Sequence, residues 1–181
     1  MKGIVFNLLE DIVRRTHGED AWDDLLETAG VAGSYTSLGN YDDAELSRLV
    51  SAASVALKLP EYEVVRWFGR EALPLLARKY PVLFDRHTST RSFLLALNDI
   101  IHPEVRKLYP GADVPEFEYD TSSPDVLLMT YRSRRRLCAF AEGLVEGAAA
   151  HFGERLLFEQ PRCMHRGDEA CTFRISLSPH G

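Results

Sequence analysis

The sequence predicts an α+β fold in which a helical first half is followed by an antiparallel sheet. In the first half, apolar residues recur at helical spacing, as Ile4, Leu8 and Ile12 do. In the second half, short apolar runs alternate with turn-forming residues, which is typical of strands. Their order (strand, strand, helix, strand, strand) predicts a C-terminal subdomain with a four-stranded antiparallel sheet.

Four helices are expected before residue 80, because four apolar stripes with helical spacing follow one another there. The breaks between them are marked by turn-forming residues: His17-Gly18, Gly30, Gly33, residues 37–42 and Pro60. Pro74 and Pro81 punctuate the region that follows the fourth stripe.

A longer helix is predicted after residues 88–90, which can cap it, and it extends to Leu108. His102 lies at the edge of its apolar stripe, two turns after Leu95. A lone inward-facing histidine is more often a core residue with a hydrogen-bond partner than a ligand. One neutral imidazole on an apolar face is also what an axial haem ligand requires.

Two hairpin-like units are expected in the second half. Residues 115–120 and 126–132 flank the turn-like TSSPD and predict the first hairpin. A helix over residues 135–152 follows, and residues 154–160 and 171–177 predict two more strands around a turn.

Composition excludes several classes of protein. The 181 residues suffice for one substantial domain, and 45% hydrophobic with 27% charged residues is an ordinary globular mixture. The net charge of −6 disfavours a nucleic-acid-coating protein. The chain contains no long apolar window and no signal peptide, so no membrane association is expected. Three cysteines provide no disulfide framework and fit a reducing cytoplasm.

The segment YRSRRR, residues 131–136, concentrates cationic groups in an otherwise acidic chain. In an extended conformation Tyr131, Ser133 and Arg135 share one face. Two hydroxyls and one guanidinium suit one or two carboxylates, because arginine binds carboxylates through two parallel hydrogen bonds. The alternatives are a solvated strand end paired with surface acids or, less favoured, a nucleic-acid contact.

The pattern Tyr131-x-Ser133-x-Arg135, with His102 upstream and Pro115 between, resembles the haem-nitric oxide/oxygen binding (H-NOX) family, which includes the haem domain of soluble guanylate cyclase. The similarity covers essentially the whole chain, from the initial MKG to EGLVEG at residues 142–147. The resemblance implies that His102 is the proximal ligand of the haem iron. It also implies that Tyr131, Ser133 and Arg135 hold the propionates and that Pro115 presses on the porphyrin.

The resemblance further implies a division into two subdomains with the haem between them. Residues 1–63 correspond to a distal helical subdomain, and residues 64–181 correspond to a proximal α/β subdomain that carries the iron ligand. The cofactor expected is haem b, bound noncovalently because the chain has no CxxCH sequence.

The distal side of the haem determines which gas binds. The positions that match distal positions of the family are Val5, Leu9, Pro74, Phe140 and Leu144. Oxygen-binding members have a tyrosine where this chain has Phe140, and none of the five side chains donates a hydrogen bond. We therefore expect ferrous haem that binds NO and CO and excludes O₂.

Cys138, Cys163, Cys171 and His165 form a candidate zinc set, since three thiolates and an imidazole suffice for tetrahedral coordination. Some bacterial members of the family have a zinc site with cysteines at these places, but with a histidine where this chain has Gln160. The alternatives are a redox-sensitive cysteine cluster, or small core residues with half-buried thiols.

These observations predict a non-enzymatic gas sensor with no output domain of its own. Family members of this kind usually act on a histidine kinase or a cyclic-di-GMP enzyme. The main alternative is a haem-independent zinc or thiol redox sensor with the same fold. A haem oxygenase or peroxidase is disfavoured, since the matched distal positions offer no acid–base group.

Overall fold

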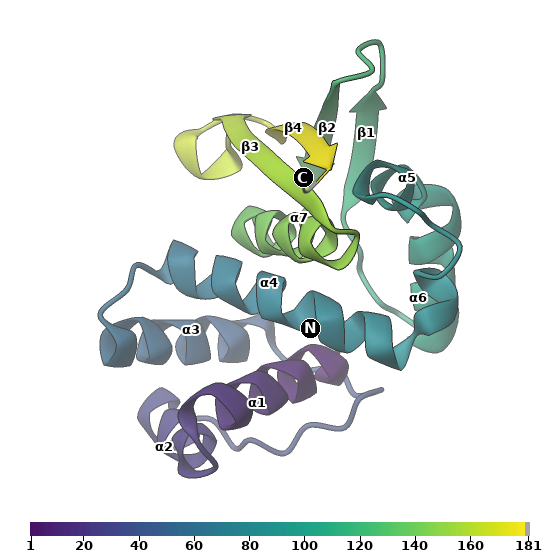
Figure 1. The fold of residues 1–181 in the computed structure, drawn as a ribbon. Coiled ribbons are helices and arrows are strands. Elements are labelled where there is room, and N and C mark those ends of the chain that lie inside the picture. The colour runs from purple at the N-terminus through teal and green to yellow at the C-terminus, as the bar shows by residue number, and fades with distance from the viewer. Residues whose placement is uncertain (180–181) are drawn as a thin grey trace.

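The structure is a computed structural model that describes residues 1–179; the last two residues of the predicted proximal subdomain, 180 and 181, lie outside the described part. It is α+β, as the sequence predicted. Figure 1 shows the layers: the sheet lies over α7 (Cys138–His151), α7 lies over α4 (Glu61–Lys79), and the remaining N-terminal helices lie on the far side of α4.

The N-terminal part consists of α1 (Gly3–His17), α2 (Asp20–Ala29), α3 (Asp43–Leu57) and α4. The expected breaks are present: α2 ends at Gly30, which is left-handed with φ 63°, and α4 begins directly after Pro60. Asp42 caps α3 by accepting a hydrogen bond from the Ala44 amide at 3.0 Å. Pro74 does not interrupt the chain as predicted, because α4 continues through it to Lys79.

The predicted long helix is divided. A turn over residues 81–83 leads to α5 (Thr90–Leu95), which Ser89 caps through its side chain. A π-helical turn over Leu97–Ile101 then separates α5 from α6 (His102–Leu108). Single π-helical turns are rare and frequently occur at functional sites. This one brings the chain directly to His102.

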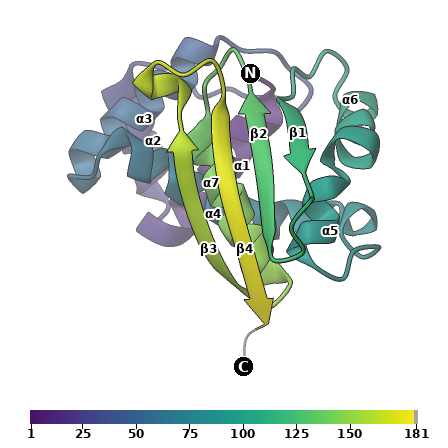
Figure 2. The ribbon, with the colours of Figure 1, turned by 90° about the horizontal axis from the view of Figure 1, so that it is seen from above.

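The second half forms the predicted hairpins. β1 (Glu116–Asp120), β2 (Val126–Arg132), β3 (Glu154–Arg162) and β4 (Cys171–Pro179) form one antiparallel sheet in the order β1-β2-β4-β3. Figure 2 shows α7 crossing behind this sheet, with α5 and α6 beyond the β1 edge. The β3–β4 register shifts between Glu159 and Arg162, around Pro161, which has no amide hydrogen for the ladder.

Two hydrophobic clusters divide the interior. One lies among α1, α2, α3 and α4, and the other lies between the sheet, α7 and the segment around α5. α4 contributes to both, since Phe68 belongs to the first cluster and Leu73 to the second. The predicted subdomain boundary at residues 63 and 64 falls within α4 and stays a prediction.

The two clusters meet where α4 crosses α7 at very short range. A Cβ atom added to Gly143 would lie 1.9 Å from the Arg66 carbonyl oxygen, and one added to Gly69 would lie 2.3 Å from the Phe140 carbonyl oxygen. Only glycine permits this approach of the two backbones. Tyr62 and Arg66 of α4 also contact Glu142, which is buried in α7.

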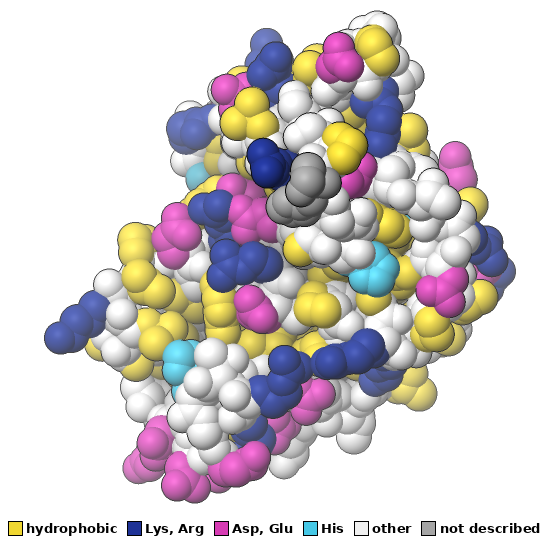
Figure 3. Space-filling view, in the orientation of Figure 1, with side chains coloured by type: hydrophobic (Ala, Val, Ile, Leu, Met, Phe, Trp, Pro, Cys, Tyr) yellow, Lys and Arg dark blue, Asp and Glu magenta, His cyan; other side chains and the backbone are white. Residues whose placement is uncertain are grey.

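The surface mixes charges of both signs, and Figure 3 shows acidic and basic side chains interspersed on one face. Hydrophobic side chains are exposed where α3 ends and α4 begins, at Val55, Leu57, Leu59 and Tyr62. Within residues 1–179, the helices are too short or too polar to cross a lipid bilayer.

Candidate functional site

His102 is the first residue of α6 and is partly buried. Its ring stacks on Phe117 of β1, with 5.6 Å between ring centroids. Burial lowers its pKa to about 4, and the positive charge of Arg106 acts in the same direction. The imidazole is therefore neutral at pH 7, which is the form that binds iron. Among the described residues, no hydrogen bond occupies either ring nitrogen.

Tyr131 lies on β2 and is almost fully buried. Its ring lies between Phe117 and Phe173, each 5.8 Å away between centroids. Burial raises the pKa of its hydroxyl to about 12, while a hydrogen bond with the Ser133 side chain acts in the opposite direction. Phe117 thus contacts both His102 and Tyr131, so the fold brings these two predicted site residues to one aromatic side chain.

Arg135 already binds carboxylates in this structure. Its Nε donates to Oδ2 of Asp43 at 2.8 Å, and its Nη1 donates to the carbonyl and Oδ2 of Asp113, each at 2.8 Å. The Ser133 hydroxyl accepts the Arg135 amide at 3.2 Å. Asp43 also accepts from the N-terminal ammonium of Met1 at 2.6 Å. The guanidinium therefore binds carboxylate oxygens here, which is the chemistry that a propionate requires, and its Nε and Nη1 are engaged by Asp43 and Asp113.

Sequence reasoning missed Asp43 and Asp113. Asp43 is the first residue of α3 and lies 92 positions before Arg135, so no local pattern joins them. The solvated reading of the arginine segment holds for two of its three exposed arginines, since Arg132 pairs with Glu118 at 2.6 Å and Arg134 pairs with Asp113 at 2.7 Å.

The predicted distal side chains come from two helices. Val5 and Leu9 lie on α1, and Phe140 and Leu144 lie on α7; all four are buried or partly buried. Phe140 packs on Phe68 of α4, with ring centroids 4.9 Å apart. Pro74, by contrast, is exposed on α4 and belongs to neither hydrophobic cluster, so the structure does not bring it together with the other four.

A cavity of about 150 Å³ lies between the start of α1 and α6. It brings Val5 and Arg135, two of the predicted site residues, to one space, together with Ile4, Val105, Tyr109 and Ala112. This volume is below the range of typical cofactor pockets, which begins at about 300 Å³. A cofactor at this place requires α1 and α6 to move apart. Pro115 precedes β1 in the same region of the chain and is partly buried.

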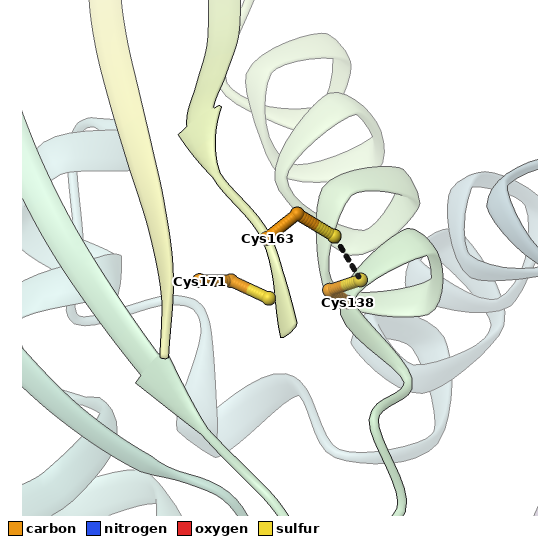
Figure 4. Close-up of side chains that lie close together, drawn as sticks. All are labelled: Cys138, Cys163 and Cys171. Carbon is orange, nitrogen blue, oxygen red and sulfur yellow. Dashed lines mark hydrogen bonds between the residues drawn. The ribbon is translucent and has the colours of Figure 1, made fainter. Parts of the chain in front are cut away.

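Three cysteines converge where β3 and β4 meet the start of α7 (Figure 4). The sulfurs of Cys138, Cys163 and Cys171 all lie within 4.8 Å of one another, and all three residues are buried. The sulfurs of Cys138 and Cys163 are 3.9 Å apart. Burial raises the pKa of the Cys138 and Cys171 thiols. Thiolates at this distance from one another are the ligands that zinc prefers.

His165 does not join this group, so the predicted fourth zinc ligand is wrong. The residue is exposed, and its Nε2 is hydrogen-bonded to the carbonyl of Arg136 at 2.7 Å. It lies on a short 3₁₀ turn over Met164–Arg166 and is not in the group that the three sulfurs form. Gln160 lies near Cys138: its side-chain amide offsets part of the rise that burial causes in the pKa of the Cys138 thiol.

Comparison with known proteins places this geometry in a family. The model of the haem-NO-binding family matches residues 2–160. An H-NOX protein from S. oneidensis in the Fe(II)NO ligation state is 35% identical, with a TM-score of 0.93 over 98% of this chain and 99% of that chain.

Two further solved structures are similar. The IWP-051-bound H-NOX from Shewanella woodyi in the Fe(II)CO ligation state is 32% identical, with a TM-score of 0.84 over 100% of this chain and 96% of that one. The Fe(II) unliganded H-NOX protein from K. algicida is 25% identical, with a TM-score of 0.88 over 99% and 98%. The family match over most of the chain and the 35% identical relative together show that this chain belongs to the haem-NO-binding (H-NOX) family.

Proposed function

We propose that this chain is a haem-based gas sensor that binds nitric oxide and carbon monoxide. The observation that carries the proposal is the contact of Phe117 with both His102 and Tyr131, which brings a neutral imidazole without a hydrogen-bond partner to a buried tyrosine. The guanidinium of Arg135, which binds carboxylates, supports it. Relatives in the Fe(II)NO and Fe(II)CO states support the choice of gases.

The roles of the residues follow from their chemistry. Haem b supplies the ferrous iron to which the gas binds. His102 offers its free ring nitrogen to that iron, and the aromatic contact with Phe117 orients the ring. Arg135, Ser133 and Tyr131 donate hydrogen bonds to the propionates.

The same residues support the exclusion of O₂. Bound dioxygen is strongly polarised and is retained by a hydrogen-bond donor, whereas the predicted distal side chains Val5, Leu9, Phe140 and Leu144 offer none. The tyrosine that lines the cavity together with Val5 is Tyr109, and its hydroxyl is hydrogen-bonded to that of Tyr80. The same lack of an acid–base group on these side chains favours a sensor over an oxygenase or peroxidase.

Signalling would use the junction between the two hydrophobic clusters. His102 would hold the iron through its ring nitrogen, and its release would free α6 and the π-helical turn before it, a local change that would alter how the clusters pack. The family suggests a cytoplasmic histidine kinase or cyclic-di-GMP enzyme as the recipient, and three free cysteines fit a reducing cytoplasm.

An absorption spectrum of the purified, dithionite-reduced protein under argon, then in air, then with NO tests the proposal. We expect a ferrous Soret band that ignores O₂ and shifts with NO. His102→Gly should lose the imidazole-ligated spectrum and recover it on addition of free imidazole, while His17→Gly, at an exposed position, should leave it unchanged. Absence of a Soret band after haem reconstitution would contradict the proposal.

A second candidate function concerns the cysteines. Three buried sulfurs within 4.8 Å of one another favour a zinc site or a thiol redox sensor of the same fold. We propose zinc as the resident ion, because three sulfurs this close together can ligate one ion and zinc prefers thiolate ligands. Metal analysis of the reduced protein, followed by thiol counting after peroxide, distinguishes the two: a metal-free protein whose thiols still oxidise would favour the redox reading.

A further inference from the structure

The cysteine cluster supplies three ligands, although structural zinc sites almost always have four. Within residues 1–179, no histidine, aspartate or glutamate joins the three sulfurs in a common set. We infer that zinc at this cluster is held by Cys138, Cys163 and Cys171 alone, that Gln160 donates a hydrogen bond to a bound thiolate, and that the fourth coordination position is open. This inference rests on the zinc proposal above.

The position of Gln160 supports the role of a donor. The residue lies near the end of β3, three positions before Cys163, and its Nε2 atom is buried without a hydrogen-bond partner among the described residues. A buried amide nitrogen without an acceptor is costly. The Cys138 sulfur becomes a strong acceptor when a metal deprotonates it.

Charge explains why a donor is required. Three thiolates around one Zn²⁺ leave a net negative charge in a buried site, and N–H groups that face the sulfurs offset it. The Met164 amide already donates to the Cys171 sulfur at 3.3 Å. Gln160 adds a second donor on the side of Cys138. Ligation through its carbonyl oxygen would instead bring a hard, neutral ligand to a site whose other ligands are soft.

An open fourth position changes what the site can do. Zinc with three protein ligands binds water or a small exogenous ligand in the remaining position, as in catalytic zinc sites. The metal should therefore exchange more readily than in a site with four protein ligands.

Cobalt substitution tests the inference, because the electron paramagnetic resonance of high-spin Co²⁺ reports its coordination and ferrous haem gives no conventional signal there. The reduced, haem-containing protein is titrated with Co²⁺ and then with imidazole, in the wild type and in the variants Gln160→Ala, Gln160→His and His165→Ala. We expect imidazole to shift the cobalt signal of the wild type. Gln160→His should bind Co²⁺ more tightly and ignore imidazole, because its own ring fills the open position.

The variants Gln160→Ala and His165→Ala test whether Gln160 donates a hydrogen bond to a bound thiolate or is itself a metal ligand. Gln160→Ala should weaken metal binding by about 10- to 100-fold, as loss of a hydrogen-bond partner to a metal ligand does, while remaining responsive to imidazole. His165→Ala should match the wild type. A wild type that ignores imidazole, with Gln160→Ala alone responding, would show that Gln160 is itself a ligand and would overturn the inference.

Failure of zinc binding and failure of the haem proposal are distinguishable. Chelator competition with Zn²⁺ and the Soret band are measured on the same samples. A protein with an intact Soret band that takes up neither Co²⁺ nor Zn²⁺ would overturn both the zinc proposal and this inference, and the gas-sensor proposal would be unaffected.

Discussion

At the scale of single residues, Phe140 is the side chain on which the proposed exclusion of O₂ depends. Its ring packs on Phe68 and offers no donor. Phe140→Tyr adds one hydroxyl, and a hydrogen bond to a charged group contributes about 1.5–3 kcal/mol. We expect the variant to form an oxygen complex that the wild type does not form, measured by absorption of the reduced protein on mixing with O₂. Phe140→Leu, which adds no donor, should not form it.

His102 predicts a pH dependence in the haem-free protein. Its pKa is about 4 when folded and 6.5 ordinarily, so between these values the unfolded chain binds more protons. The free energy of unfolding should fall by about 3 kcal/mol in total as the pH drops from above 6.5 to below 4, in addition to the effect of other groups. Denaturant unfolding of the wild type and His102→Leu measures the difference.

Stability falls toward acid pH because burial disfavours the charged imidazole. The difference in unfolding free energy between the wild type and His102→Leu should therefore narrow or reverse as the pH falls. His17→Leu, at an exposed position, is the matched control and should show no such trend. An equal pH profile for wild type and His102→Leu would mean that the ring is solvated.

At the scale of elements, the α4–α7 crossing sets the geometry of the site, because Phe140 and Leu144 flank Gly143 on α7. Gly143→Ala would normally stabilise a helix by about 1 kcal/mol. Here the new methyl would lie 1.9 Å from the Arg66 carbonyl oxygen, so the helices must separate. We expect a net loss of about 1–3 kcal/mol in unfolding free energy, measured by chemical denaturation.

Haem spectra of the same variant should change, since α7 carries Phe140 and Leu144, two of the predicted distal side chains. Ala150→Gly, at an exposed position of the same helix, is the control. It should cost at most about 1 kcal/mol through helix propensity and leave the spectrum unchanged. Stabilisation by Gly143→Ala would show that the two backbones are not in close contact.

Periodicity and turn residues predicted the N-terminal helices, both hairpins and α7, because those elements carry one apolar face each. The same reasoning failed at Pro74 in α4, a helix that packs against both hydrophobic clusters, and in the segment before His102. It treated Pro74 as a break, yet α4 tolerates a proline because packing against both clusters holds the helix together. It predicted one helix to Leu108, and the π-helical turn at Leu97–Ile101 has no sequence signal of its own.

At the scale of the whole molecule, the residues that join the two clusters could not be predicted from sequence. Arg135 was found from a local motif, but its partner Asp43 is brought to it only by the packing of α3 against the rest of the chain. His165 was assigned to zinc by proximity in sequence, and tertiary contacts with Arg136 direct it elsewhere. The chemistry of a local motif can thus be predicted from the sequence, whereas contacts between residues distant in the sequence cannot.

The network of Asp43, Arg135 and the N-terminal ammonium of Met1 joins α3 to the segment after β2. Asp43→Asn removes the charge that both cations share, which should cost about 1 kcal/mol because Asp43 is partly exposed. Hydrogen exchange should accelerate in α1 and at the start of α3 while the sheet stays protected, since only the N-terminal helices lose this tie. Asp11→Asn, an exposed change of equal charge on α1, should leave exchange unchanged.

Asp43→Asn also tests coupling to the gas. If NO binding moves the N-terminal helices relative to the rest of the chain, the NO-dependent change in hydrogen exchange should be smaller in Asp43→Asn than in the wild type, because the ion pair with Arg135 is already lost. An unaltered NO response would show that Asp43 does not couple the haem site to the N-terminal helices.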